Sequence, residues 1–269
     1  MKKLYFIPIF ILLLTGCEKD ANIKLDEMPP VPVIEGYFSN FAPDSYFKIS
    51  MSKGFQRDTY EYEPVTDAQL SVTDSQGNII HFYPDNEGVY RTTTGGVPGE
   101  TYTLNLTKDA HHVTAMSNMT EQIYLNDFEF ITVTQPDGDT DDQLILYFND
   151  PDNQVDYYMI KLFFRYDNFD TFNGYGFDIY FDDKNYNRQE HSLALSYIPY
   201  DGAGDYKVKL YHLNKAYIDY LNTLDQLSNM DYGESPFQIS VPGNPETNVQ
   251  GGIGYFATVA SDSLIKYVD

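Results

Sequence analysis

The stretch Thr101-Tyr102-Thr103-Leu104-Asn105-Leu106-Thr107 decides the fold of this chain. Apolar residues occupy every second position, so one face of an extended strand is apolar and the threonines lie on the other. Lys108-Asp109-Ala110 is short enough to be a tight connection to the next run, His111 to Met116. Together the two runs predict an antiparallel hairpin with one buried face.

The same pattern recurs towards the N-terminus. Val31 to Phe38 and Tyr46 to Ser52 are short runs of strand-forming residues. Asp74-Ser75-Gln76-Gly77-Asn78 and Pro98-Gly99 are turn signals that separate such runs. Because no window sustains a period of 3.6 residues, we expect one β-sandwich over residues 31–118.

A second β-rich, sandwich-like domain is expected over residues 121–269, after the polar link Ser117 to Glu121. Val155 to Tyr166 has one apolar face, with Lys161 and Arg165 on the other. Further strands are predicted on both sides of this run, and the chain closes with a hairpin.

One amphipathic helix is expected near residues 215–228 of this second domain. Asn214 is a suitable N-cap because its side-chain oxygen can accept a hydrogen bond from a free N–H of the first turn. The apolar positions then follow helical spacing, which predicts packing against a sheet of the second domain. They are Tyr217, Tyr220, Leu221, Leu224 and Leu227.

Composition narrows the function classes. The chain of 269 residues carries 40 acidic and 17 basic side chains, a net charge of −23, which excludes the basic footprint of a nucleic-acid-binding protein. The aromatic residues are 25 Tyr and 18 Phe with no Trp, which favours a β-rich protein. An alternative is that some of them are stacking platforms for sugar rings, although Trp is the usual residue for that purpose.

The N-terminus has the pattern of a secretory signal. Lys2 and Lys3 precede an apolar run, Leu4 to Leu14, that is too short to span a bilayer. Leu14-Thr15-Gly16-Cys17 resembles the bacterial lipobox, and Cys17 is the only cysteine. We therefore expect a lipoprotein signal peptide over residues 1–16, lipid attachment at Cys17 and a tether over residues 17–30; the alternative is a buried free cysteine.

This prediction places the protein at a membrane. Two or more acyl chains anchor a protein stably where one does not. Removing residues 1–16 leaves 15 basic and 40 acidic side chains, a net charge of −25. The acidic start of the tether, Glu18-Lys19-Asp20, resembles the export signal that sends lipoproteins of the Bacteroidota to the outer face of the outer membrane.

No catalytic, cofactor-binding or metal-ligating residue is predicted, so we do not expect an enzyme. Asp137, Asp139 and Asp141 have the alternate spacing of a calcium loop, but Asp142 and Phe148 stand where that motif needs Gly and Glu. A solvated hairpin loop is the better interpretation. Adjacent histidines His111 and His112 on one strand point to opposite faces and cannot share a metal. Gly251-Gly252-Ile253-Gly254 is not followed by a predicted helix, so a bulge or close strand approach is favoured over a phosphate loop.

Two resemblances to known families add to this interpretation. Residues 65–116 look like the carboxypeptidase-regulatory, or transthyretin-like, sandwich, through turn glycines and core positions that imply an immunoglobulin/transthyretin-like fold and no activity. The residues that carry this likeness are Ala68-Gln69-Leu70-Ser71-Val72, Gly77, Gly88-Val89-Tyr90 and Gly99-Glu100-Thr101-Tyr102.

The order of motifs along nearly the whole chain resembles a Bacteroidota lipoprotein family known as a domain of unknown function, number 4249 in that series. Its most specific piece is the block Asn248 to Phe256, with the pattern Asn-x-x-Gly-Gly-x-Gly-x-Phe. Val33-Ile34-Glu35-Gly36 and Phe148-Asn149-Asp150-Pro151 are further matching pieces. The resemblance implies that the gene lies beside one for a TonB-dependent receptor, and hence that the protein has an accessory role in nutrient capture.

Two function classes therefore stay open from the sequence. The first is a surface-exposed outer-membrane lipoprotein that acts as the binding partner of a TonB-dependent receptor barrel. The second is a structural or adhesive surface lipoprotein with no import role. For the first class, the Gly/Asn/aromatic loops Phe169 to Gly176 and Pro242 to Gly254 are the expected docking or ligand edge.

Overall fold

The computed structural model describes residues 29–53, 63–149, 154–165, 171–176, 178–184, 191–196, 202–228 and 245–269. Within these ranges the chain is mainly β and has one α-helix, as the alternating runs and the helical stripe predict. No helix among these residues is both long and apolar enough to cross a membrane. The predicted signal peptide and Cys17 lie outside the described residues.

The first sandwich is built from one sheet that folds over onto itself. Its strands pair in the order β1-β2-β6-β5-β4-β7-β8-β16, and β3 pairs with β2. They are β1 (Pro32–Ser39), β2 (Tyr46–Met51), β3 (Glu63–Pro64), β4 (Gln69–Asp74), β5 (Ile79–Pro84), β6 (Val89–Arg91), β7 (Thr101–Lys108), β8 (His111–Asn118) and β16 (Val249–Gln250). The 3-10 turn η2 (Ala42–Asp44) joins β1 to β2.

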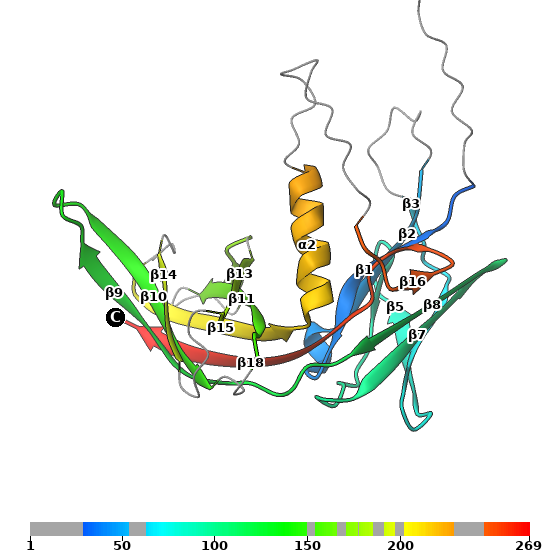
Figure 1. The fold of residues 1–269 in the computed structure, drawn as a ribbon, viewed down its shortest axis with the longest axis horizontal. Helices are drawn as coiled ribbons and strands as arrows, with labels where there is room; N and C mark the ends of the chain where they lie inside the picture. Colours follow the sequence, from blue (N-terminus) through cyan, green and yellow to red (C-terminus); the bar gives the residue numbers. More distant parts are fainter. Residues whose placement is uncertain are drawn as a thin grey trace, which may run out of the picture.

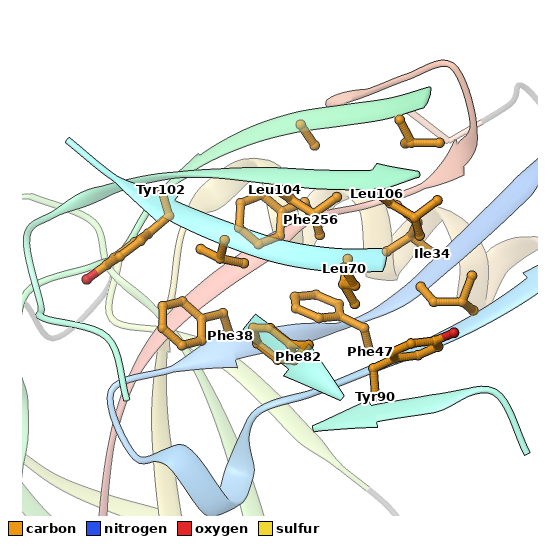
Figure 2. Packing of buried hydrophobic residues seen from close by; sticks show 14 of the residues in the cluster. Ile34, Phe38, Phe47, Leu70, Phe82, Tyr90, Tyr102, Leu104, Leu106 and Phe256 are labelled. Carbon is orange, nitrogen blue, oxygen red and sulfur yellow. The ribbon is translucent and has the colours of Figure 1, made fainter. Parts of the chain in front are cut away.

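The alternating pattern that predicted this sandwich also builds its core. Tyr102, Leu104 and Leu106 of β7 are all at most 2% exposed, so the apolar face of that strand is the buried one, as predicted. Side chains from β1, β2, β4 and β5 pack with them in one core (Figure 2). The rings of Phe38 and Tyr102, for example, pack edge to face with centroids 5.0 Å apart.

The second sandwich has two sheets. A three-stranded sheet, in the order β14-β10-β9, packs over part of the large sheet through buried residues such as Phe128, Leu144 and Val208. Its strands are β9 (Tyr124–Thr134), β10 (Thr140–Asn149) and β14 (His191–Ser196). The facing strands are β11 (Tyr157–Arg165), β12 (Asn173–Gly174), β13 (Ile179–Asp182), β15 (Gly204–Leu213) and β18 (Ala257–Val268).

Strand β18 belongs to both sandwiches. Its first residues, Ala257 to Val259, pair in parallel with Tyr37 to Ser39 of β1, and its later residues, 260–268, pair antiparallel with β15. The large sheet is therefore continuous from one sandwich to the other, and β18 runs from beneath the helix to the far end of the molecule (Figure 1).

This pairing corrects one predicted range. Residues 249–259 were expected in the domain 121–269, but β16 pairs with β8, and β17 (Ile253–Gly254) pairs with β1. Val249 and Phe256 lie in the core of the first sandwich. The physical reason is that β1 and β8 would otherwise each leave a row of backbone groups unpaired. The first sandwich thus includes the segment 249–259 as well as residues 31–118.

Helix α2 (Lys215–Ser228) has the predicted bounds, and Asn214 is its N-cap, accepting a hydrogen bond from the N–H of Tyr217 at 2.8 Å. The helix stands on the seam between the two sandwiches (Figure 1). Only its first turns are buried: Tyr217 and Ile218 are 7% and 5% exposed, whereas Leu224 is 39% exposed. The prediction that the stripe packs as far as Leu224 is therefore wrong.

The partners of the helix also differ from the prediction. Tyr217 stacks on Tyr255, which directly precedes β18, with ring centroids 5.5 Å apart. The same cluster contains Tyr37 of β1 and Tyr211 of β15, so the helix base packs on strands of both sandwiches rather than on the second alone.

Two substitutions test how far the helix is packed. We expect Ile218→Ala to lower the free energy of unfolding by about 2–3 kcal/mol, because it removes a fully buried branched side chain. Leu224→Asp should cost under about 1 kcal/mol, because the side chain already contacts water. Urea unfolding of both variants measures the two values, and a larger loss for Leu224→Asp would contradict this packing.

Candidate functional site

The glycine-rich block Asn248 to Phe256 lies clamped between strands of the first sandwich. Gly254 has φ +110°, and a Cβ there would lie 2.0 Å from the carbonyl oxygen of Ile34. A Cβ on Gly251, whose φ is +80°, would lie 2.3 Å from the carbonyl oxygen of His112. These glycines therefore let the segment approach β1 and β8 closely, as the sequence favoured, and the block lies between strands rather than at a free ligand edge.

Asn248 holds the same block in register. Its amide nitrogen donates to the carbonyl oxygens of Met116 at 2.9 Å and Phe256 at 2.8 Å, and its side-chain oxygen accepts from the Phe256 N–H at 2.9 Å. Phe256 then fills the first core and contacts Phe47, with ring centroids 5.8 Å apart. The pattern from Asn248 to Phe256 is thus explained by packing.

The other sequence candidates lie as follows. The acidic stretch around Asp137 is the hairpin loop between β9 and β10, closed by the Gln135 N–H donating to the Asp139 carbonyl at 2.7 Å. His111 and His112 are neighbours on β8. Among the described residues, no group of three or more His, Cys, Asp or Glu side chains is arranged to hold a metal ion. Of the loop Phe169 to Gly176, residues 171–176 are described, and β12 within it pairs with β11.

A buried polar group ties the link between the sandwiches to β15. His212 Nδ1 lies 2.9 Å from the carbonyl oxygen of Glu121, and Nε2 lies 3.0 Å from Asp156 Oδ1. Both side chains of the His212–Asp156 pair are at most 6% exposed. Both ring nitrogens of His212 therefore face oxygen atoms.

The hydrogen bonds around the buried His212–Asp156 pair indicate a structural role. Thr120 of the link donates to the His212 carbonyl at 2.7 Å and accepts from the Ala260 N–H at 3.2 Å. Asp183 accepts the Asp156 N–H at 2.7 Å. The link after β8 is therefore fixed against the point where β15 meets β18.

A cleft of about 400 Å³ opens beside this fixed link. Three segments far apart in the sequence line it. Asn40, Phe41 and Asp44 come from the connection after β1, and Gln122 and Tyr124 come from the link and the start of β9. The third segment is 261–263 of β18. The volume of the cleft lies in the range of ligand pockets, ~300–1,000 Å³, and such pockets occur preferentially where two domains meet.

A hydrogen-bond network joins the three segments that line this cleft, which is called the junction cleft below. The Asn40 amide nitrogen donates to Gln122 Oε1 at 2.8 Å and to the Ser261 carbonyl at 3.0 Å. The Asn40 side-chain oxygen accepts the Ser261 N–H at 2.7 Å. One asparagine therefore holds all three lining segments together, which preorganises the cleft before any ligand enters.

Asp44 is neutralised from within the protein. Lys209 Nζ pairs with Asp44 Oδ1, and the Tyr211 hydroxyl donates to Oδ2 at 3.1 Å. The Asp44 side chain is 6% exposed. Burial first, and then the charge of Asp44, raises the pKa of Tyr211 above its usual value, so the phenol stays a donor. This ion pair also joins the first sandwich to β15 of the second.

Two aromatic rings at the cleft are open to solvent. Phe41 is 48% and Tyr124 is 59% exposed. Lys209 Nζ lies 5.8 Å from the Phe41 ring centroid, which fixes one aromatic against the ion pair. No basic side chain is among the described residues that line the cleft. The arrangement suits a ligand that stacks on rings and donates hydrogen bonds to oxygen atoms, rather than a phosphate or another anion.

The sequence alone did not identify this cleft. Its residues sit at strand ends and in links, where no periodicity singles them out. The one local signal is Ser261-Asp262-Ser263, a run of three consecutive polar residues within β18. A second hollow of about 340 Å³ lies over β4, β5 and β7, but its lining comes from one sheet of the first sandwich alone.

The comparison with protein families decides the classification. The family described as "Domain of unknown function (DUF4249)" matches residues 18–265, nearly the whole chain. The chain belongs to this family. Membership of the DUF4249 family confirms the family predicted from the order of motifs, and it assigns no activity.

No curated protein matches the chain. Among solved structures, a cytokine receptor complex is similar at 10% identity and a TM-score of 0.25, covering 69% of this chain and 86% of that chain. A two-domain fibronectin type III segment from chicken tenascin is 14% identical with a TM-score of 0.19, covering 70% of this chain and 89% of that chain. TM-scores this low establish no shared arrangement between this DUF4249 protein and those structures.

Proposed function

We propose that this DUF4249 protein is a lipid-anchored protein on the outer face of the outer membrane that helps a TonB-dependent receptor take up a nutrient. The observation that carries the binding role is the junction cleft, with its hydrogen-bonded lining segments and its two exposed rings, Phe41 and Tyr124. The lipobox-like stretch that ends at Cys17 supports the anchor.

The anchor makes a modest interface sufficient. A lipid tether confines the protein and the receptor to one membrane plane, which raises their effective concentration. The strongly acidic body is repelled by an anionic lipid surface, so the described sandwiches should stand away from the membrane rather than lie on it. The segment 171–176, whose residues Asn173 and Gly174 are exposed, stays the proposed receptor edge, because the block 247–256 is occupied in packing against the first sandwich.

The anchor is tested by Cys17→Ala. We expect this variant to lose incorporation of a lipid label and to leave the membrane fraction, because no other anchor is proposed. External protease applied to intact cells should degrade the wild-type protein. Protection of the lipidated wild type in intact cells, with degradation after lysis, would place the body in the periplasm and contradict the proposed location.

The receptor partnership has its own test. Purification of the tagged protein from the outer membrane in mild detergent should bring down a large barrel, and deletion of the gene should slow growth on one nutrient. Tyr124→Ala serves as the matched control, because a change in the cleft should leave the barrel contact intact. Normal growth together with no copurified barrel would favour the structural or adhesive role instead.

A further inference from the structure

We propose that the junction cleft binds a neutral saccharide. A sugar ring presents one apolar face and a rim of hydroxyl groups, and the cleft offers the complement of both. Tyr124, 59% exposed, supplies an aromatic ring to the lining, and Asp262 supplies carboxylate oxygens. A saccharide would be the nutrient that the receptor takes up, and this biological meaning rests on the function proposed above. Binding of a saccharide by the cleft does not depend on that function.

Asp262 is positioned to accept hydrogen bonds from hydroxyl groups. The Leu125 N–H donates to Oδ2 at 2.9 Å, and the Ser263 N–H donates to Oδ1 at 2.9 Å. A carboxylate offers about four lone-pair sites, so each oxygen can accept one more bond. Two neighbouring hydroxyls of one sugar are suitable donors, because both oxygens are already held in place by the backbone.

The charges argue for a neutral ligand. The other carboxylate at the cleft, Asp44, is already paired with Lys209 and with the Tyr211 hydroxyl. No basic side chain lines the cleft among the described residues, and the whole chain carries −23, so an acidic ligand would be repelled. Asp262 has its two backbone donors and, among the residues that the structure describes, no salt bridge to Lys or Arg, which leaves its lone pairs for uncharged donors.

The amides shape the cleft rather than hold the sugar. Both N–H groups of Asn40 are used on Gln122 and Ser261, so its role is to fix the three segments. Among the described residues that line the cleft, the groups available to a ligand are the Tyr124 ring and hydroxyl, the Ser263 hydroxyl and the remaining Asp262 lone pairs. Phe41 is a further aromatic residue of the same lining. This division gives a cleft that needs no rearrangement on binding.

Affinity electrophoresis tests the proposal. The full-length protein is purified in a polyoxyethylene detergent, since glycoside detergents would compete, and is run in native gels that contain dextran, laminarin, mannan or soluble starch. The acidic protein migrates fast towards the anode, so retardation by a neutral polysaccharide is easily measured. We expect retardation in at least one of these gels and none in an alginate gel.

Variants assign the binding to the cleft. Tyr124→Ala should weaken the apparent affinity on the order of tenfold, which corresponds to about 1.4 kcal/mol. Tyr124→Phe should keep most of the apparent affinity, because the ring that stacks on the sugar remains. Asp262→Asn should weaken the apparent affinity, although its side-chain oxygen can still accept a hydrogen bond from the backbone. Tyr267→Ala, which removes another exposed tyrosine at the far end of β18, should bind as the wild type does.

Three results would overturn the proposal: no retardation in any neutral gel, retardation only by alginate, or retardation that Tyr124→Ala and Asp262→Asn leave unchanged. Circular dichroism of each variant checks that the fold is intact, and Tyr124 is exposed enough that its loss should not disturb folding. The gels contain neither membrane nor receptor, so their outcome is independent of whether a barrel copurifies.

Discussion

Replacing Gly254 with alanine is expected to lower the free energy of unfolding by about 4–6 kcal/mol. Backbone strain at a conformation that L-residues avoid costs ~1–3 kcal/mol, and forced overpacking costs a further ~1–3 kcal/mol. We expect the upper part of the summed range because the new Cβ would lie 2.0 Å from a backbone oxygen of Ile34, which cannot rotate away. Relief would require β17 to move off β1.

Gly77→Ala is the matched control. Gly77 also has positive φ, +88°, but nothing lies within 4 Å of its Cβ position. Its substitution should therefore cost only the backbone term, ~1–2 kcal/mol. Urea unfolding of both variants separates the two contributions. Equal losses at Gly77 and Gly254 would mean that the close approach to β1 contributes nothing.

His212→Ala is expected to cost about 3–5 kcal/mol, because it leaves the buried Asp156 carboxylate without the ring nitrogen that lies 3.0 Å from it. The Glu121 carbonyl would lose its donor as well. The stacked contact between His212 and Tyr158, with ring centroids 5.4 Å apart, would also be lost. We therefore expect this variant to loosen the link after β8 and to lower the unfolding midpoint.

Asp156→Asn separates the effect of losing the carboxylate charge from the effect of losing the shape of the side chain. An asparagine keeps the size of the side chain and can donate to Nε2 of a neutral ring, so we expect a smaller loss than for His212→Ala. Combining the two changes completes a double-mutant cycle measured by urea unfolding. Strictly additive losses would contradict a direct His212–Asp156 interaction.

The features that the sequence predicted correctly are local. The helix Lys215–Ser228 was predicted with its bounds because the cap Asn214 and the apolar spacing lie within one segment. The turn at Asp74 was predicted for the same reason. Its carboxylate accepts the N–H groups of Gln76 and Asn78 at 2.9 and 2.8 Å, and Gly77 takes the positive φ.

The features that the sequence did not predict depend on pairings across the chain. Ala257 to Val259 have the same strand character whichever neighbour they pair with, so nothing local assigns them to β1. Leu224 fits the helical stripe equally well whether or not a sheet reaches it. The cleft depends on Asn40 meeting Ser261, 221 residues later. Periodicity carries no information about such contacts.

The sharing of β18 has a consequence for biosynthesis. A ribosome releases β1 more than 200 residues before the strand that covers its open edge. Until residues 249–259 have been synthesised, the first sandwich exposes the edges of β1 and β8. Unpaired strand edges are templates for aggregation. The N-terminal sandwich can therefore be completed only after the C-terminal segment of the chain has been synthesised.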